Sequence, residues 1–172
     1  MTLATALRLD IGSSHLRVRP DYTTVDLYAP EADVRADMGA LPFDDGSVEE
    51  IWASHCLEHV GPERTVPVLR EWLRVLRPGG PAIVMVPNAD YAARYWLHGP
   101  DRAMARQMIY GHQAEQGETH LTAWNAEMLR ADLTEAGFDI VSLTSVFEDA
   151  DHTQGGSYFH TMESLRAEVR KP

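Results

Sequence analysis

Apolar and polar positions divide this chain into short buried runs separated by amphipathic or turn-rich segments. A short apolar-rich run bounded by polar or turn residues predicts a buried strand. The runs of this kind are Leu7–Gly12, Thr24–Leu27, Val48–Ser54, Ala82–Val86, Phe138–Leu143 and Ser164–Val169. We expect the last of them to be antiparallel and to close one edge of a sheet.

Helical periodicity appears between the strands. Apolar residues recur at helical spacing over Thr65–Leu76, which predicts an amphipathic helix capped by Thr65. A second helix is predicted to begin after Asn125, a favourable N-cap, and to end at Gly137.

The segment before that second helix is rich in aromatic and polar residues. Asp90–Tyr110 is interrupted at Gly99-Pro100, which predicts two short helices, and the polar Gly111–Thr122 is expected to be a loop. Residues 90–122 are therefore predicted to form a lid or substrate insertion. Asp149–Ser157 is expected to be rich in turns.

Alternating strands and helices with short connections predict a single α/β domain over residues 1–172. The expected architecture is an open, Rossmann-like, mostly parallel sheet with helices on both faces. The residues between the first two strands show no helical stripe, so the helix of the first crossover is expected to be missing. Ligands of such sheets bind at the carboxyl ends of the strands.

Composition narrows the class of partner. The 172 residues carry 26 Asp and Glu against 15 Lys and Arg, a formal net charge of -11. Nucleic acids and anionic membranes attract basic surfaces, so neither is an expected partner, and a small-molecule substrate fits better. One cysteine, Cys56, cannot form an internal disulfide, and the amino terminus lacks the pattern of a signal peptide or membrane span. We expect a cytoplasmic protein.

Polar residues follow three of the predicted strands. Asp10-Ile11-Gly12-Ser13-Ser14 ends the first strand with a glycine, which allows a close approach to a ligand or simply makes a turn. Asp26 ends the second strand, where a carboxylate can accept two hydrogen bonds from a ribose diol or remain solvated. Asp37 in Ala36-Asp37-Met38 could accept from an exocyclic amine, and Leu41-Pro42-Phe43 could wall a base.

In order along the chain, these segments resemble a known family. They are Leu9-Asp10-Ile11-Gly12-Ser13, Val25-Asp26, Ala36-Asp37, Leu41-Pro42-Phe43, Ala53-Ser54-His55-Cys56-Leu57-Glu58-His59, Arg74-Val75-Leu76-Arg77-Pro78-Gly79-Gly80 and Val86-Pro87-Asn88. The set is similar to the class I S-adenosylmethionine (SAM)-dependent methyltransferase superfamily, in particular its small bacterial members of the type 11-like group. The resemblance implies a seven-stranded sheet and SAM as cofactor.

The same resemblance implies roles for individual residues. Gly12 and Ser13 would approach the methionine part of SAM, and Asp10 would fix its amino group. Asp26 would hold the ribose, Asp37 and the Met38 backbone would read the adenine, and Ser54 with His55 would lie beneath the sulfonium. These assignments describe a methyltransferase that acts on a small-molecule acceptor at O, N or C.

Two departures from the family pattern keep an alternative open. Ser14 stands where the family has its second glycine, and the first crossover helix is missing. The alternative is a methyltransferase fold without methyl transfer, either a binding module or an enzyme of another class such as a cyclase. A homodimer could cover the open side of the cofactor site.

Histidines are the candidates for acid-base chemistry, because their ordinary pKa lies near neutrality. His55, His112 and His120 are predicted to serve as acid or base. The alternative for the two loop histidines, His112 and His120, is that their side chains are simply solvated. His55 and His59 have a spacing that could hold a metal, but neither a third ligand nor a cysteine pair stands beside them in the sequence. We therefore expect no metal and interpret His59 as structural.

Overall fold

The computed structural model describes residues 6–14, 17, 19–114, 116–147 and 162–172. The predicted turn-rich stretch Asp149–Ser157 lies outside these residues. The strands are β1 (Arg8–Ile11), β2 (Thr23–Asp26), β3 (Val34–Arg35), β4 (Glu50–Ser54), β5 (Pro81–Pro87), β6 (Asp139–Phe147) and β7 (Glu163–Arg170). The helices are the 3-10 turn η1 (Leu57–His59) and α1 (Pro62–Val75), α2 (Ala89–His98), α3 (Arg102–Tyr110) and α4 (Ala126–Ala136).

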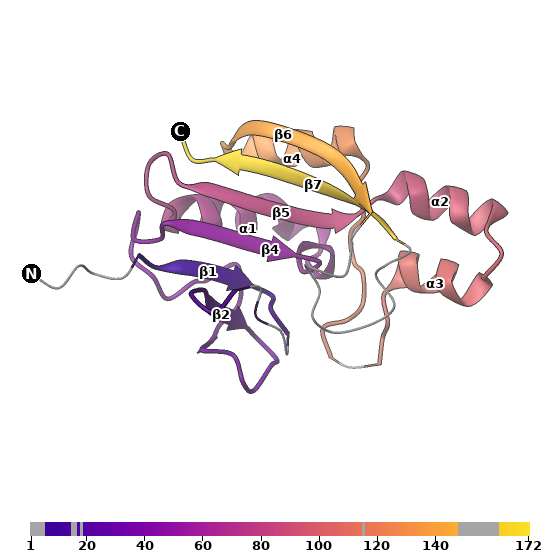
Figure 1. The fold of residues 1–172 in the computed structure, drawn as a ribbon, viewed down its shortest axis with the longest axis horizontal. Coiled ribbons are helices and arrows are strands. Elements are labelled where there is room, and N and C mark those ends of the chain that lie inside the picture. The colour runs from indigo at the N-terminus through magenta and orange to yellow at the C-terminus, as the bar shows by residue number, and fades with distance from the viewer. Residues whose placement is uncertain (1–5, 15–16, 18, 115, 148–161) are drawn as a thin grey trace, which may run out of the picture.

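The seven strands form one sheet in the order β3-β2-β1-β4-β5-β7-β6 (Figure 1). The first five strands pair in parallel, and β7 is antiparallel to both β5 and β6. The predicted seven-stranded, mostly parallel architecture is therefore confirmed. The expectation that the last strand closes the edge is wrong, because β7 lies between β5 and β6 and leaves β6 outermost. The short β3 was not predicted, because two residues carry no periodic signal.

The main core lies between the sheet and the two helices that pack along it. Helices α1 and α4 contact each other, so they lie on the same face of the sheet, behind it in Figure 1. Trp72 of α1 and Leu133 of α4 are fully buried against strand residues such as Ile51 and Val84. Alternate side chains of the strands point to the opposite face, over which the described part of the chain places no helix (Figure 1). The expectation of helices on both faces is therefore wrong for the described residues, because the first crossover carries none.

The first crossover is short, as the sequence predicts. Its described residues, 12–14, 17 and 19–22, form no helix. Over this part of the sheet Tyr22, Trp52 and Met85 form a small buried cluster of their own. In its described residues, the crossover from β1 to β2 thus lacks the helix that a βαβ unit usually contains.

Helix boundaries follow local capping chemistry. Asn125 accepts a hydrogen bond from the Met128 amide at 2.9 Å and caps α4, and Gly137 ends it with a φ of 107°, as predicted. The predicted Thr65 cap of α1 is wrong. That helix begins at Pro62 after Gly61, because the fixed φ of proline suits the first helical position.

Helices α2 and α3 stand apart from the sheet. They pack on each other beyond the carboxyl ends of β4 and β5 (Figure 1). Ala92, Met108 and Met162 are buried between them and have their own apolar neighbours, so this pair has a small core separate from the main one. The two predicted short helices are confirmed. That they act as a lid stays a prediction.

Candidate functional site

A glycine turn joins β1 to the first crossover. Gly12 has a φ of 70°, and a Cβ added there would lie 2.2 Å from Cβ of Cys56, so only glycine fits between β1 and the segment after β4. Its amide donates to the Val25 carbonyl at 2.8 Å. Ser13 is buried, and its Oγ has no hydrogen-bond partner among the described residues.

Ser14 takes the backbone conformation of a glycine. Its φ is 50°, in the left-handed region that costs an ordinary residue roughly 1–2 kcal/mol. The side chain is exposed, so it does not crowd the turn. The departure from the family's glycine pattern is therefore a matter of backbone strain.

Asp26, at the end of β2, accepts hydrogen bonds from the loops around it. One carboxylate oxygen accepts from the Ser14 amide at 2.9 Å, and the other accepts from the amides of Tyr28 at 2.7 Å and Ala29 at 2.9 Å. A carboxylate can accept about four hydrogen bonds, so capacity for one more donor remains. Asp26 holds the glycine turn against the end of β2 and can still accept from a hydroxyl.

Asp37 follows β3 and is tied to α1. Both of its oxygens accept from Arg64, at 3.0 and 2.9 Å, and the Gly39 amide donates to one of them at 2.8 Å. Burial raises the pKa of Asp37, but the hydrogen bonds from Gly39 and Arg64 outweigh it and lower the pKa overall. The Met38 carbonyl accepts from the Trp72 indole at 3.0 Å. The role of Asp37 and Met38 toward adenine stays a prediction.

Directly after β4, His55 connects two distant parts of the fold. It has a φ of 52°, and its side chain is 11% exposed. Nε2 lies 3.2 Å from Oγ of Ser164 in β7, and Nδ1 lies 3.3 Å from Oε1 of Glu58 in η1. Strained backbone of this kind is concentrated at functional sites. Its neighbour Ser54 contacts Sδ of Met85 through Oγ at 4.0 Å.

Glu58 is a buried carboxylate that the sequence analysis did not single out. Its side chain is 2% exposed, and Oε2 has no hydrogen-bond partner among the described residues. Burial raises the pKa of Glu58, but the hydrogen bond with His55 and the nearby His59 and His120 lower it overall. Glu58 is therefore charged while nearly out of reach of water.

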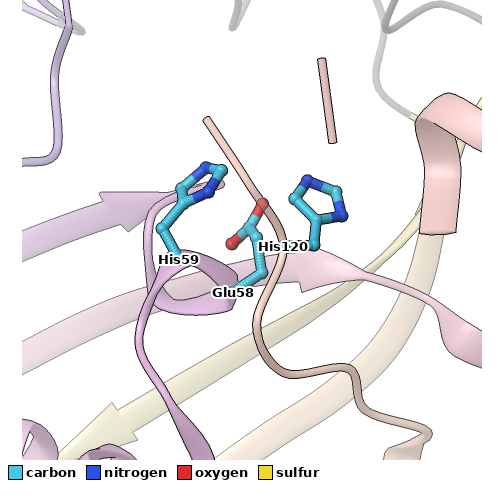
Figure 2. A group of neighbouring side chains, drawn as sticks. All are labelled: Glu58, His59 and His120. Carbon is cyan, nitrogen blue, oxygen red and sulfur yellow. The ribbon is translucent and has the colours of Figure 1, made fainter. Parts of the chain in front are cut away.

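His59 and His120 lie beside this carboxylate (Figure 2). Their ring centroids are 5.2 Å apart, with an edge-to-face orientation. The loop that carries His120 is held there because the amides of Leu121 and Thr122 donate to the Glu58 carbonyl at 2.8 and 3.2 Å. These backbone bonds place His120, which is far away in the sequence, beside Glu58 and His59, a grouping that the sequence analysis did not consider.

His112 does not join this group. It lines an open hollow on α3, together with Arg106 and Tyr110. Of the three histidines predicted to act as acid or base, His55 and His120 thus share Glu58 as a neighbour, whereas His112 lies elsewhere on the same loop.

Several of the known proteins that this chain resembles are methyltransferases. Residues 5–84, a little under half of the chain, match the family model of a methyltransferase domain. The methyltransferase GfsG of Streptomyces halstedii is 33% identical over 118 residues, which make up 69% of this chain and 38% of that protein. The chain spans about a third of the length of the curated relatives it matches.

Solved structures with the same fold cover nearly the whole chain. A SAM-dependent methyltransferase of Methanosarcina mazei superposes with a TM-score of 0.69 at 16% identity, over 98% of this chain and 94% of that one. A Burkholderia thailandensis 1,6-didemethyltoxoflavin-N1-methyltransferase, solved with 1,6-didemethyltoxoflavin and S-adenosylhomocysteine, has a TM-score of 0.63 at 19% identity, over 96% and 71%. Residues 5–84 are thus similar to a methyltransferase domain, and the chain as a whole has the fold of these SAM-dependent methyltransferases.

The residues at the carboxyl ends of the parallel strands suit SAM chemically. The strand order β3-β2-β1-β4 places Asp37, Asp26, Asp10 and Ser54 along one edge of the sheet, each near the carboxyl end of its strand. The carboxylates complement a ribose diol and a cationic sulfonium. The partnerless, buried Oγ of Ser13 is a further polar atom at this edge, so the residues present fit the cofactor.

The sequence analysis did not single out Glu58, and it interpreted His59 as structural. An acidic residue between Leu57 and His59, close to a buried strand, is itself unusual. That signal could have identified Glu58. Nothing in the sequence predicted that His120 would contact it.

Among the described residues, none of the helices has both the length and the apolar character required to cross a membrane.

Proposed function

We propose that the protein is a SAM-dependent methyltransferase acting on a small-molecule acceptor. The observation that carries this proposal is the row of polar residues at the carboxyl ends of four neighbouring strands, with Asp37, Asp26, Asp10 and Ser54 in that spatial order. The shared fold and the match of residues 5–84 to a methyltransferase domain support it. The activity, acceptor and partners of the whole protein are part of the proposal.

The carboxyl edge of the sheet has two parts, and we assign cofactor binding to one and acceptor binding to the other. Asp26 would accept from the ribose, Gly12 and Ser13 would lie along the methionine part, and Asp37 with the Met38 backbone would meet the adenine. Bound SAM supplies a methyl group already activated by a positively charged sulfur. The chain's own task is therefore to orient the acceptor, exclude water and take up a proton where the acceptor carries one.

The acceptor would enter from the side of β4 and β5. There the histidines His55, His59 and His120 surround Glu58, and the α2–α3 pair stands beyond the strand ends (Figure 1). We propose that residues 90–122 cover the bound acceptor. The Burkholderia thailandensis methyltransferase was solved with the small molecule 1,6-didemethyltoxoflavin, which supports an acceptor of comparable size.

The acidic composition and the bare first crossover suggest two further features. We propose a cytoplasmic location without nucleic-acid or membrane partners. We also propose that a second copy of the chain covers the cofactor edge where a crossover helix would otherwise lie.

Calorimetry with S-adenosylhomocysteine tests the cofactor assignment. Asp26→Asn keeps the size of the side chain but removes its charge, and hydrogen bonds to charged groups contribute about 1.5–3 kcal/mol, so affinity should fall by roughly 10- to 100-fold. Asp139→Asn, at the exposed start of β6, is the matched control and should bind like the wild type. Circular dichroism checks that each variant is folded.

Two results would count against the proposal. A folded wild-type protein that does not bind S-adenosylhomocysteine at millimolar concentration would favour the alternative of a methyltransferase fold without methyl transfer. Equal affinity of wild type and Asp26→Asn would show that the ribose assignment is wrong.

A further inference from the structure

Glu58, His59 and His120 form a cluster in which each residue offers one ligand atom, and these atoms all lie within 4.8 Å of one another (Figure 2). We propose that this Glu58–His59–His120 cluster is a binding site for a divalent transition-metal ion. The three residues come from η1 and from the loop after α3, two segments that the backbone bonds to the Glu58 carbonyl hold together.

The buried carboxylate supplies the first reason. Oε2 of Glu58 is buried and without a hydrogen-bond partner among the described residues. A buried polar atom left without a partner costs about 1–3 kcal/mol, and more when it is charged. A cation bound to Oε2 would remove that cost, and the neighbouring imidazoles are the groups that would complete its coordination.

His59 is arranged as metal-binding histidines usually are. Its Nδ1 lies 3.1 Å from the Thr119 carbonyl oxygen, which can only accept, so Nδ1 carries the hydrogen. In the neutral ring this leaves the lone pair on Nε2. A hydrogen bond from one ring nitrogen to a backbone carbonyl is the outer contact that fixes the tautomer and orientation of a metal ligand.

His55 provides the corresponding outer contact for Glu58. Its Nδ1 lies 3.3 Å from Oε1, and its Nε2 lies 3.2 Å from Oγ of Ser164. The ring therefore orients the carboxylate through Oε1 and leaves Oε2, which has no hydrogen-bond partner among the described residues, available to a cation. His55 is a positioning residue in this arrangement.

The donor set indicates which metals would bind. Two imidazoles and one carboxylate suit Zn²⁺ and related ions such as Co²⁺ and Fe²⁺, whereas Mg²⁺ and Ca²⁺ prefer oxygen ligands. Three protein ligands leave at least one coordination position open, as in catalytic zinc sites. If the proposed function holds, an oxygen of the acceptor would take that position, and His120 would act as a ligand in place of a base.

Cobalt binding tests the site. We would titrate the tag-free full chain with Co²⁺, follow its visible absorption, and displace the ion with Zn²⁺. Glu58→Gln, His59→Ala and His120→Ala should each lose more than about 100-fold in affinity, because even outer contacts of metal ligands contribute 10–100-fold. His55→Ala removes only an outer contact, so it should lose roughly 10-fold.

Two control variants separate a built site from adventitious binding. His98→Ala at the exposed end of α2 and Glu127→Gln at the exposed start of α4 remove the same residue types and should bind Co²⁺ like the wild type. Thermal unfolding without metal checks that all variants fold. If the ligand variants bind Co²⁺ as tightly as the wild type, or if the folded wild type does not bind at millimolar Co²⁺, the metal site is refuted.

Measuring Co²⁺ and S-adenosylhomocysteine binding on the same samples distinguishes the metal site from the proposed function. Co²⁺ binding without S-adenosylhomocysteine binding would support the metal site and overturn the cofactor assignment. S-adenosylhomocysteine binding without Co²⁺ binding would do the reverse.

Discussion

The two halves of the sheet are stabilised in different ways. Around β1, β2 and β3, carboxylates hold the loops by hydrogen bonds. Asp26 accepts from three backbone amides, and Asp33 accepts from Thr24 and Arg17. Around β4, β5, β6 and β7, helices α1 and α4 cover the sheet with a continuous apolar core, which reaches β1 and β2 only through Leu9, Ile11 and Val25. Where a short chain lacks a covering helix, local hydrogen bonds to carboxylates hold the loops in place.

One helix connects the two halves. Arg74 of α1 donates to the carbonyls of Phe43 at 2.9 Å and Leu41 at 3.1 Å, and Glu71 accepts from the Leu41 amide at 2.8 Å. Trp72 adds the bond to the Met38 carbonyl. The loop between β3 and β4 is thus attached to the apolar half, which suggests that both halves unfold as one unit.

The largest effect is expected from Trp72→Ala. The side chain is fully buried, and the substitution removes both its packing and the bond to Met38, so the free energy of unfolding should fall by about 3–5 kcal/mol. Chemical denaturation followed by circular dichroism measures this. Trp96→Ala, whose side chain is 46% exposed in α2, is the control and should change stability by less than about 0.5 kcal/mol. Two separate transitions in the wild type would contradict a single folding unit.

A smaller effect is expected from Asp33→Ala in the carboxylate-stabilised half. The substitution removes the bonds to the Thr24 amide at 2.9 Å and the Thr24 hydroxyl at 3.0 Å, so the free energy of unfolding should fall by about 1–2 kcal/mol. Asp139→Ala at an exposed position is the control. A loss no greater than that of the control would show that carboxylates do not stabilise this half.

The effect of Asp33 should also depend on pH. The ion pair with Arg17 and the hydrogen bond from Thr24 lower the pKa of Asp33 in the folded chain. The unfolded chain therefore takes up the proton first as the pH falls. The difference in stability between wild type and Asp33→Ala should be full near neutrality and shrink as the pH falls toward that lowered pKa.

The smallest effect, and the opposite in sign, is expected from Ser14→Gly. Glycine takes a φ of 50° without the strain that Ser14 bears, so unfolding should cost roughly 0.5–1 kcal/mol more. Ser47→Gly in the turn before β4 relieves no positive φ and serves as the control. Thermal unfolding compares the two, and a destabilised Ser14→Gly would show that the strain argument is wrong.

Much of the fold follows from the sequence alone. Apolar runs predicted six of the seven strands, and capping residues such as Asn125, together with Gly137, fixed the limits of α4. These signals are local, since a strand or a helix end depends on residues close in the chain. The ordered polar positions Asp10, Asp26 and Asp37 likewise indicated the ligand edge, because parallel strands carry their carboxyl ends to one side.

Other features depended on the tertiary structure. The position of β7 between β5 and β6 depends on which strands pair. The alternation of apolar and polar residues predicts a strand but not its neighbours in the sheet. The cluster of Glu58, His59 and His120 forms because amides of a distant loop donate to the Glu58 carbonyl. Burial in the folded chain leaves Oε2 without a hydrogen-bond partner in the part of the chain that the structure describes. The sequence by itself determined which edge of the sheet carries the polar residues. Only the folded chain decided which of them meet, because contacts between distant segments depend on packing of the whole.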